Sequence, residues 1–198
     1  MLKIRMRLFH KSDAREVFSM PRSAEELHSG GFIHSQTVSV KKVVFVIAPE
    51  GFNDSELLDP KAILENEGIK VTIASTVLGK CHGMRGSEAQ STMIIEEVNP
   101  DEYDGIVVVG GSGALQHLQD NESLLTLLKE FGKMGKMVSA IGRARHSLHN
   151  AGFFGTNFSW GSKVEINGNI IAARPPTTTP GWTSKDFGHL LVKHLQGP

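Results

Sequence analysis

The sequence is poor in cysteine, in net charge and in long hydrophobic runs. Of its 198 residues only Cys81 is a cysteine, which excludes an internal disulfide and is typical of a reducing, cytoplasmic setting. Basic and acidic residues balance at 21 each, so no global charge favours nucleic acid or a membrane surface as partner. No apolar run approaches the roughly 18 residues of a membrane-spanning helix. The length predicts one globular domain, with or without a tail.

The first 40 residues differ in composition from the rest. Residues 1–18 carry five basic residues against two acidic ones and lack the uninterrupted apolar core of a secretory signal. Residues 22–40 are rich in Ser, Gly and His, which is typical of a linker. We expect residues 1–40 to form an extension, partly disordered or adding a strand, and residues 41–198 to form the domain. An organelle-targeting role for residues 1–24 is the alternative.

After residue 40, short apolar runs alternate with amphipathic segments. Runs typical of buried parallel strands lie at 41–48, 69–75, 103–109 and 136–142. Helices are expected at 53–68, 121–135, 143–152 and 183–195. Asn53 or Asp54 can cap the first of these helices, and Pro60 predicts a break or kink in it. Asn167-Gly168 predicts a hairpin turn within 162–174, and Thr183 with Asp186 predicts an approximate capping box at the start of the last helix. The alternation predicts an α/β fold, with a mainly parallel sheet covered by helices on both faces.

Three loops follow buried strands and therefore meet at the carboxyl edge of such a sheet, where sites form. In the first, Glu56 lies early on a helix, either facing the crevice or solvated. In the second, Gly110, Gly111 and Gly113 offer backbone N–H groups that can hold an oxyanion or phosphate, or form a merely structural turn. Their spacing matches neither the dinucleotide fingerprint nor the Walker pattern.

The third loop has the pattern of a nucleophile elbow without a nucleophile. In "SAIGRARHSLHNAG" an apolar strand turns sharply into a helix, but the residue at the turn is Gly142. Glycine fits such a backbone without strain and carries no reactive group. Arg143, beside it, places a cation where the helix dipole opposes one.

These loops resemble those of the ThiJ/PfpI superfamily, the glutaminase-like fold of the Parkinsonism-associated deglycase and the PfpI-type peptidases. The resemblance runs from about Lys41 to Leu195. It rests on "GFNDSELLDP", "EGIKVTIAS", "EYDGIVVVGGSGA", "VSAIG" and "INGNIIAARPPTTTPG". It implies a flavodoxin-like three-layer sandwich and, commonly, a homodimer.

The resemblance also implies roles for individual positions. Glu56 matches the acid that hydrogen-bonds the family's nucleophilic cysteine, and Gly110 and Gly111 match the glycine pair of its oxyanion hole. Gly142 matches the cysteine itself, so the thiolate that the covalent chemistry requires is missing. The family's histidine partner has no convincing match. The segment that would hold it, between Gly152 and the next strand, is also short.

We therefore expect a non-catalytic family member with a binding or regulatory role. The alternative is a small-carbonyl deglycase or glyoxalase-type hydrolase, or a peptidase, that uses another group such as Cys81, His117 or a metal. Cys81-His82 alone is a weak metal signal, and we expect neither metal nor cofactor. A small anionic or carbonyl ligand is the expected partner. The hypothesis is that Gly142 opens a small pocket in which Arg143 and the first N–H groups of the helix hold a carboxylate or phosphate. In the simpler alternative, Arg143 and Arg145 point to solvent or pair with acids.

Overall fold

The computed structural model describes residues 39–154 and 162–197. Residues 1–38, 155–161 and 198 lie outside them, and the expected targeting segment and all but the last two residues of the expected extension fall there. In the described part, a seven-stranded sheet has the following strands in spatial order: β6 (Met93–Ile94), β3 (Lys70–Ser75), β1 (Lys42–Val46), β7 (Gly105–Val108), β8 (Met137–Ile141), β10 (Ile170–Ala173) and β9 (Val164–Asn167). All neighbours pair in parallel except β9 with β10. The mainly parallel sheet that the sequence predicts is confirmed.

A smaller sheet lies beside the main one, and short helices occupy the connections. Within the same described residues the smaller sheet consists of β2 (Glu50–Phe52), β4 (Gly79–Gly83) and β5 (Glu88–Ser91). The longer helices are α1 (Asp54–Asn66), α2 (Glu122–Lys133), α3 (Arg145–Asn150) and α4 (Ser184–Gln196). The one-turn helices are η1 (Ile95–Glu97), η2 (Pro100–Glu102), η3 (Ala114–Leu118), η4 (Gly142–Ala144) and η5 (Pro176–Thr178).

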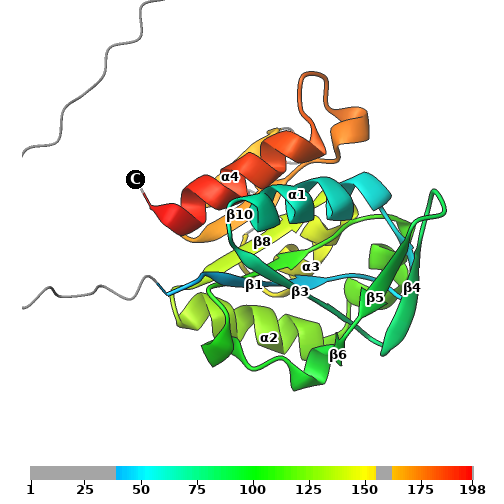
Figure 1. The fold of residues 1–198 in the computed structure, drawn as a ribbon, viewed down its shortest axis with the longest axis horizontal. Helices are drawn as coiled ribbons and strands as arrows, with labels where there is room; N and C mark the ends of the chain where they lie inside the picture. The colour runs from blue at the N-terminus through cyan, green and yellow to red at the C-terminus, as the bar shows by residue number, and fades with distance from the viewer. Residues whose placement is uncertain (1–38, 155–161, 198) are drawn as a thin grey trace, which may run out of the picture. The chain divides into compact units, whose positions relative to one another are not determined.

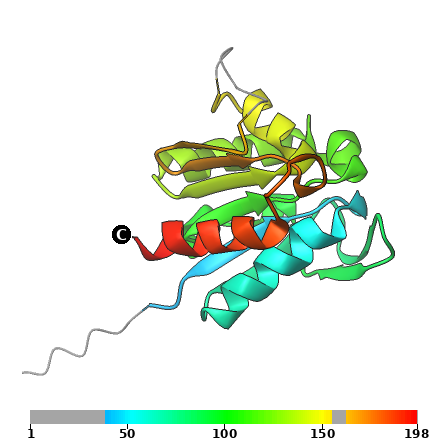
Figure 2. The same ribbon diagram turned by 90° about the horizontal axis from the view of Figure 1, so that it is seen from above.

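The helices cover the two faces of the main sheet in pairs, α1 with α4 and α2 with α3 (Figures 1 and 2). Successive strand residues point to opposite faces, so each strand contributes to two cores. Val43 and Phe45 of β1 pack in the cluster that contains Leu57 of α1 and Phe187 of α4. The alternate residues of β1 pack in the cluster that contains residues of α2 and α3. The result is the flavodoxin-like three-layer sandwich expected from the resemblance.

The structure corrects three local predictions. Helix α1 continues through Pro60, although proline removes one helical hydrogen bond, because Pro60 itself is buried and α1 packs along α4. The turn between β9 and β10 uses Gly168 and Asn169, since Asn167 still pairs with Ile170. The hairpin itself is confirmed. Asn53 stands at the N-cap of α1, but its side chain makes no capping bond there.

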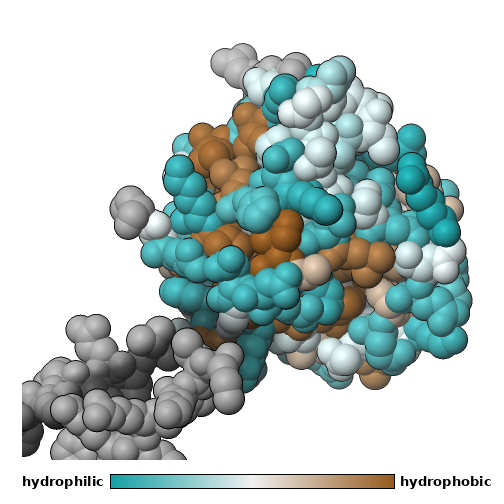
Figure 3. Space-filling view, turned by 45° about the horizontal axis from the view of Figure 1, so that its top comes forward, coloured by the Kyte–Doolittle hydropathy of each residue, from teal (hydrophilic) through white to brown (hydrophobic). Residues whose placement is uncertain are grey.

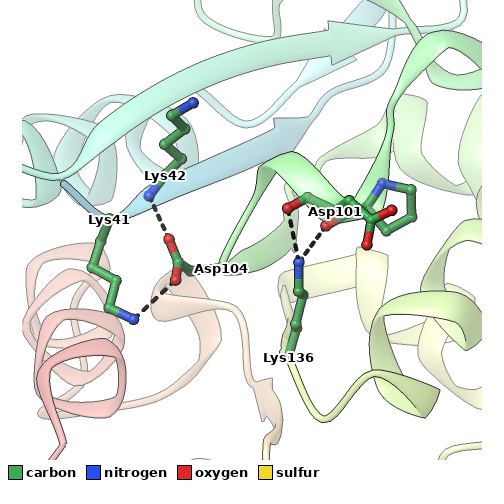
Figure 4. A network of polar contacts seen from close by, with 6 residues as sticks. Lys41, Lys42, Asp101, Asp104 and Lys136 are labelled. Carbon is green, nitrogen blue, oxygen red and sulfur yellow. Dashed lines mark hydrogen bonds and ion pairs between the residues drawn. The ribbon is translucent and has the colours of Figure 1, made fainter. Parts of the chain in front are cut away.

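The parallel strands of the main sheet begin at its amino edge, opposite the carboxyl edge where they end. Hydrogen bonds and an ion pair join the segments at this amino edge (Figure 4). Asp104, just before β7, accepts hydrogen bonds from the Lys41 ammonium at 2.9 Å and from the backbone N–H of Lys42 at 2.8 Å. Lys136, just before β8, donates to the carbonyl oxygens of Pro100 at 2.6 Å and of Asp101 at 3.3 Å. These bonds fix the starts of β1, β7 and β8 relative to one another.

Hydrophobic side chains also reach the surface in places. On the face of Figure 3, which looks toward α1 and α4, hydrophobic areas are interrupted by polar side chains. None of the described helices is both long and apolar enough to cross a membrane. The expected homodimer stays a prediction, which sedimentation equilibrium would test.

Candidate functional site

The site lies where β1, β7 and β8 end. These three strands are neighbours in the parallel sheet, so the loops after them meet at one edge. The Asn53 backbone N–H donates to the Gly110 carbonyl oxygen at 2.8 Å, and Phe52 forms an isolated antiparallel bridge with Gly111. These contacts join the loop before α1 to the glycine loop, which we define as Gly110–Gly113. The structure thereby brings together the two segments that carry Glu56 and the glycine pair.

Gly142 has the backbone of an elbow. It follows β8 directly, opens η4, and has a φ of +65°, a region that side chains rarely adopt and glycine adopts freely. A Cβ built on Gly142 would lie 2.7 Å from Glu56 Oε1 and 2.9 Å from Glu56 Cδ, and closer still to Oε2. The Glu56 carboxyl group therefore fills the space in which a side chain at this position would begin. The Glu56 carboxyl group, rather than open space, therefore lies directly beside Gly142.

Gly110 allows the glycine loop to approach the elbow. A Cβ there would lie 2.6 Å from the Ile141 carbonyl oxygen and 2.9 Å from the Arg143 backbone nitrogen, and it would overlap Glu56 Oε2. Two of these three neighbours are backbone atoms, which cannot move aside cheaply. Glu56 is therefore held in a slot between two glycines, Gly110 and Gly142.

The Glu56 side chain is only 1% exposed, although it is ionisable. Its Oε1 accepts a hydrogen bond from the Asn53 amide at 3.1 Å. Its Oε2 is buried and has no partner of hydrogen-bond geometry in the described residues. Burial raises the pKa of Glu56 to about 7, against the opposing effects of the Gly110 N–H and the Arg143 charge. Strongly perturbed acids of this kind are concentrated at functional sites.

A cavity of about 150 Å³ opens beside this acid. Its walls come from the start of α1, the glycine loop, the elbow, the β4–β5 loop and η5. Lining residues include Asn53, Glu56, Met84, Gly111, Arg143 and Thr177. Three of the five positions assigned from the sequence, Glu56, Gly111 and Arg143, thus border the cavity, while Gly110 and Gly142 enclose the carboxyl group behind it.

Arg143 is the cation of this cavity. It is exposed, and among residues 39–154 and 162–197 it forms no ion pair. The helix after the elbow, α3, has only six residues, so its dipole adds little to the positive charge of the cavity. Arg145 does not point to solvent but is 2% exposed. Burial lowers its pKa, the Glu165 charge raises it, and the Arg174 charge lowers it.

Sequence reasoning missed the residues that shape the mouth of the cavity. Asp54, read only as a possible helix cap, is 7% exposed and accepts backbone N–H bonds from Arg85 and Ser87, each at 2.9 Å. It thereby fixes the β4–β5 loop that carries Met84, whose sulfur accepts the Ser112 N–H at 3.4 Å. No local pattern reveals these contacts, because Asp54 and Ser87 are 33 residues apart.

The alternative catalytic groups lie elsewhere. Cys81 is fully buried on β4, and burial raises its pKa, which disfavours the thiolate. His117 lies on η3 and does not line the cavity. In the described ranges, no three His, Cys, Asp or Glu side chains come together as a metal site would require.

Comparison with protein families and curated proteins gives a consistent result. Residues 41–186 match the model of the DJ-1/PfpI family. An uncharacterized protein of Methanocaldococcus jannaschii is 45% identical over 154 residues, which cover 68% of this chain and 75% of that protein. The deglycase PfpI of Pyrococcus furiosus is 30% identical over 167 residues, which cover 76% of this chain and 99% of that protein.

Solved structures have the same fold. A ThiJ/PfpI domain protein from Brachyspira murdochii superimposes with a TM-score of 0.73 at 27% identity, covering 80% of this chain and 98% of the other. Drosophila melanogaster DJ-1beta gives a TM-score of 0.69 at 22% identity, covering 81% and 92%. The second likeness concerns the fold alone.

Proposed function

The chain belongs to the DJ-1/PfpI family, and we propose that within this family it is a ligand-binding member that performs no thiol-dependent reaction. One observation carries the proposal. Gly142 keeps the elbow backbone, with its φ of +65°, but the Glu56 carboxyl group occupies the place of the missing side chain. A chain with this arrangement has no nucleophile at the position that the resemblance assigns to it.

The remaining cavity supports binding. It combines an exposed cation, Arg143, with the polar residues Asn53, Ser112 and Thr177, and its volume of about 150 Å³ suits a very small molecule. A guanidinium group binds carboxylates and other anions through paired hydrogen bonds. The proposed ligand is therefore a small anion or a small carbonyl compound, and the role is binding or regulation.

The second candidate function is the enzymatic one, and the names of several relatives favour it. Proteins of Pyrococcus abyssi and Thermococcus kodakarensis that are 30% and 29% identical to this chain are named deglycases. This chain would need another nucleophile or a metal for such a hydrolytic reaction. The burial and raised pKa of Cys81 speak against that residue.

Two assays separate these functions. In the first, the protein is incubated with methylglyoxal, and with ester and peptide substrates, alongside Glu56→Ala and Cys81→Ser. We expect no turnover above that of a heat-inactivated sample. Turnover that either substitution abolishes would establish the enzymatic alternative and refute ours.

In the second assay, thermal unfolding is followed with acetate, glycolate, pyruvate and phosphate. We expect at least one carboxylate to raise the melting temperature of the wild type and of Lys129→Ala, which removes an exposed cation from the distant helix α2. The shift should disappear in Arg143→Ala. Equal shifts in all three proteins would show that the cavity is not the binding site.

A further inference from the structure

The unpartnered oxygen of Glu56 is the starting point. A carboxyl group that is 1% exposed, with one oxygen on the Asn53 amide and the other without a partner of hydrogen-bond geometry in the described residues, is poorly solvated when charged, although the nearby Gly110 N–H offsets part of this cost. The neutral acid avoids that penalty. Glu56 is therefore a group whose charge depends on what stands in the cavity beside it.

Arg143 is the second charged group beside the cavity. It is the cation that acts on Glu56, and its charge favours the ionised carboxylate. A negatively charged ligand on the guanidinium group would compensate this cation in place of Glu56. It would also set a second negative charge near a buried carboxylate. Like charges in a shared site raise the pKa of one of them, so the acid would take up a proton.

The cavity limits the size and chemistry of the ligand. Its volume of about 150 Å³ admits only a small molecule. Besides Glu56 and Arg143, the polar residues on its walls are Asn53, Ser112, Thr177 and Thr178, while Met84 and Pro175 are apolar. This combination suits a short carbon chain that carries a carboxylate and one further oxygen.

We propose that this cavity binds a small carboxylate of about two to four carbon atoms on Arg143, and that Glu56 takes up one proton as the ligand binds. The inference rests on the proposed function, because both concern the same cavity. It adds the class of ligand and a dependence of affinity on pH. Binding is then strongest when the medium is mildly acidic and weakens as Glu56 ionises.

Other charged groups around Glu56 do not account for such a dependence. Asp54, on the same helix, is engaged by backbone N–H groups that help to hold its pKa below the ordinary value despite burial. His146, on α3, has a pKa lowered by burial and by neighbouring cations, which favours its neutral form. Glu50, on β2, is exposed. The glycine loop contributes backbone to the slot, and η4 contributes Arg143.

Titration calorimetry on the full chain with glycolate and pyruvate tests the proposal. The titrations are run at pH 6 and pH 8 in two buffers of different ionisation enthalpy, so that the proton count follows from the difference in heat. We expect close to one proton taken up per ligand at pH 8, far less at pH 6, and an affinity that falls up to tenfold per pH unit above the pKa of Glu56 in the free protein.

Glu56→Gln provides the decisive variant, because it is neutral and nearly isosteric. It should bind the same carboxylates with equal affinity at pH 6 and pH 8 and without proton uptake. Glu50→Gln, the matched control, should keep the wild-type proton uptake. Thermal melts of both variants verify folding. If a variant does not fold, the wild-type proton uptake and affinity at the two pH values still test the proposal.

The other outcomes are separable. Carboxylate binding that needs Arg143 but takes up no proton at pH 8 overturns this inference and leaves the proposed function intact. Proton uptake that persists in Glu56→Gln overturns the role of Glu56. Binding of phosphate but of neither carboxylate overturns the ligand class. Both proposals are overturned if acetate, glycolate, pyruvate and phosphate all fail to bind at either pH.

Discussion

The two edges of the main sheet each hold a carboxyl group beside the same three strands, and the two groups behave in opposite ways. Asp104 lies where β7 begins, and Glu56 lies where β1, β7 and β8 end. Burial raises the pKa of Asp104, but the hydrogen bonds from Lys41 and Lys42 and the charges of Lys41 and Lys136 together hold it below its ordinary value. The pKa of Glu56 is raised by burial to about 7.

The difference shows what each edge does. At the amino edge, donors from neighbouring segments meet the Asp104 carboxylate, so its ionised form stabilises the fold. At the carboxyl edge, Glu56 keeps one oxygen without a partner in the described residues. Buried polar groups in native proteins are almost always satisfied, and an exception calls for an explanation such as a functional role. The edge with the satisfied carboxylate holds strands together, and the edge with the unsatisfied carboxyl oxygen borders the cavity.

The largest expected effect on the free energy of unfolding comes from replacing a glycine, and it should differ between the two edges. Gly110→Ala would force a Cβ to within 2.6 Å of the Ile141 carbonyl oxygen and 2.9 Å of the Arg143 nitrogen. We expect a loss of about 3 kcal/mol in the free energy of unfolding. Gly135→Ala, at the amino edge, has a φ of +67° but only one ordinary contact, with Asn169. It should lose about 1–2 kcal/mol. Urea denaturation measures both, and equal losses would contradict the tight approach at Gly110.

The next largest effect is an increase in the free energy of unfolding, expected on replacing Glu56. Its folded pKa of about 7 lies above the ordinary value of 4.5, so the folded protein loses stability as the pH rises from about 4.5 to 7. Glu56→Gln removes this loss. We expect the variant to exceed the wild type by about 1–3 kcal/mol at pH 8 and by little at pH 4.5. Denaturation at the two pH values gives the difference, and a gain independent of pH would be inconsistent with a titrating Glu56.

The corresponding change at the amino edge should destabilise. Asp104→Asn removes a carboxylate that accepts from Lys41 and from the Lys42 N–H, and we expect a loss of about 1–2 kcal/mol at pH 7. Since the pKa of Asp104 is lowered in the folded state, this stabilisation is present above pH 4 and is lost as the pH falls through the folded pKa. Asp101→Asn is the control, because only the Asp101 backbone carbonyl bonds to Lys136. A gain in stability for Asp104→Asn would erase the contrast with Glu56.

The smallest effect tests the exposed part of the same network. The side chains of Lys41 and Asp104 are 44% and 34% exposed, and their ion pair spans 2.9 Å. Lys41→Met should lower the free energy of unfolding by about 0–1 kcal/mol. In 1 M NaCl the difference should shrink, because salt screens exposed charges. A loss of several kcal/mol that salt leaves unchanged would show that the pair, rather than the buried strands, organises this edge.

Much of the fold could be predicted from local patterns. Continuous apolar runs mark β1, β3, β7 and β8, and the Thr183–Asp186 capping box predicted at the start of α4 is present in both directions. The predictions failed where tertiary contacts outweigh local preference. Pro60 does not break α1, because the helix is packed along α4. The Asn53 side chain does not cap α1, because its Oδ1 accepts the Ser55 hydroxyl while its amide N–H donates to Glu56.

The sequence by itself determined the succession of the main strands and helices along the chain. It also determined the glycine at the elbow and the position of the acid on the helix after β1. These follow from side-chain period and from residue type, which are local properties. Only the tertiary structure decided that the Glu56 carboxyl group fills the space beside Gly142, and that Arg143 and Met84 border the cavity next to it. These outcomes depend on three strand ends meeting at one edge. Segments as far apart as residues 54 and 143 then share one environment, and that environment sets the charge of Glu56.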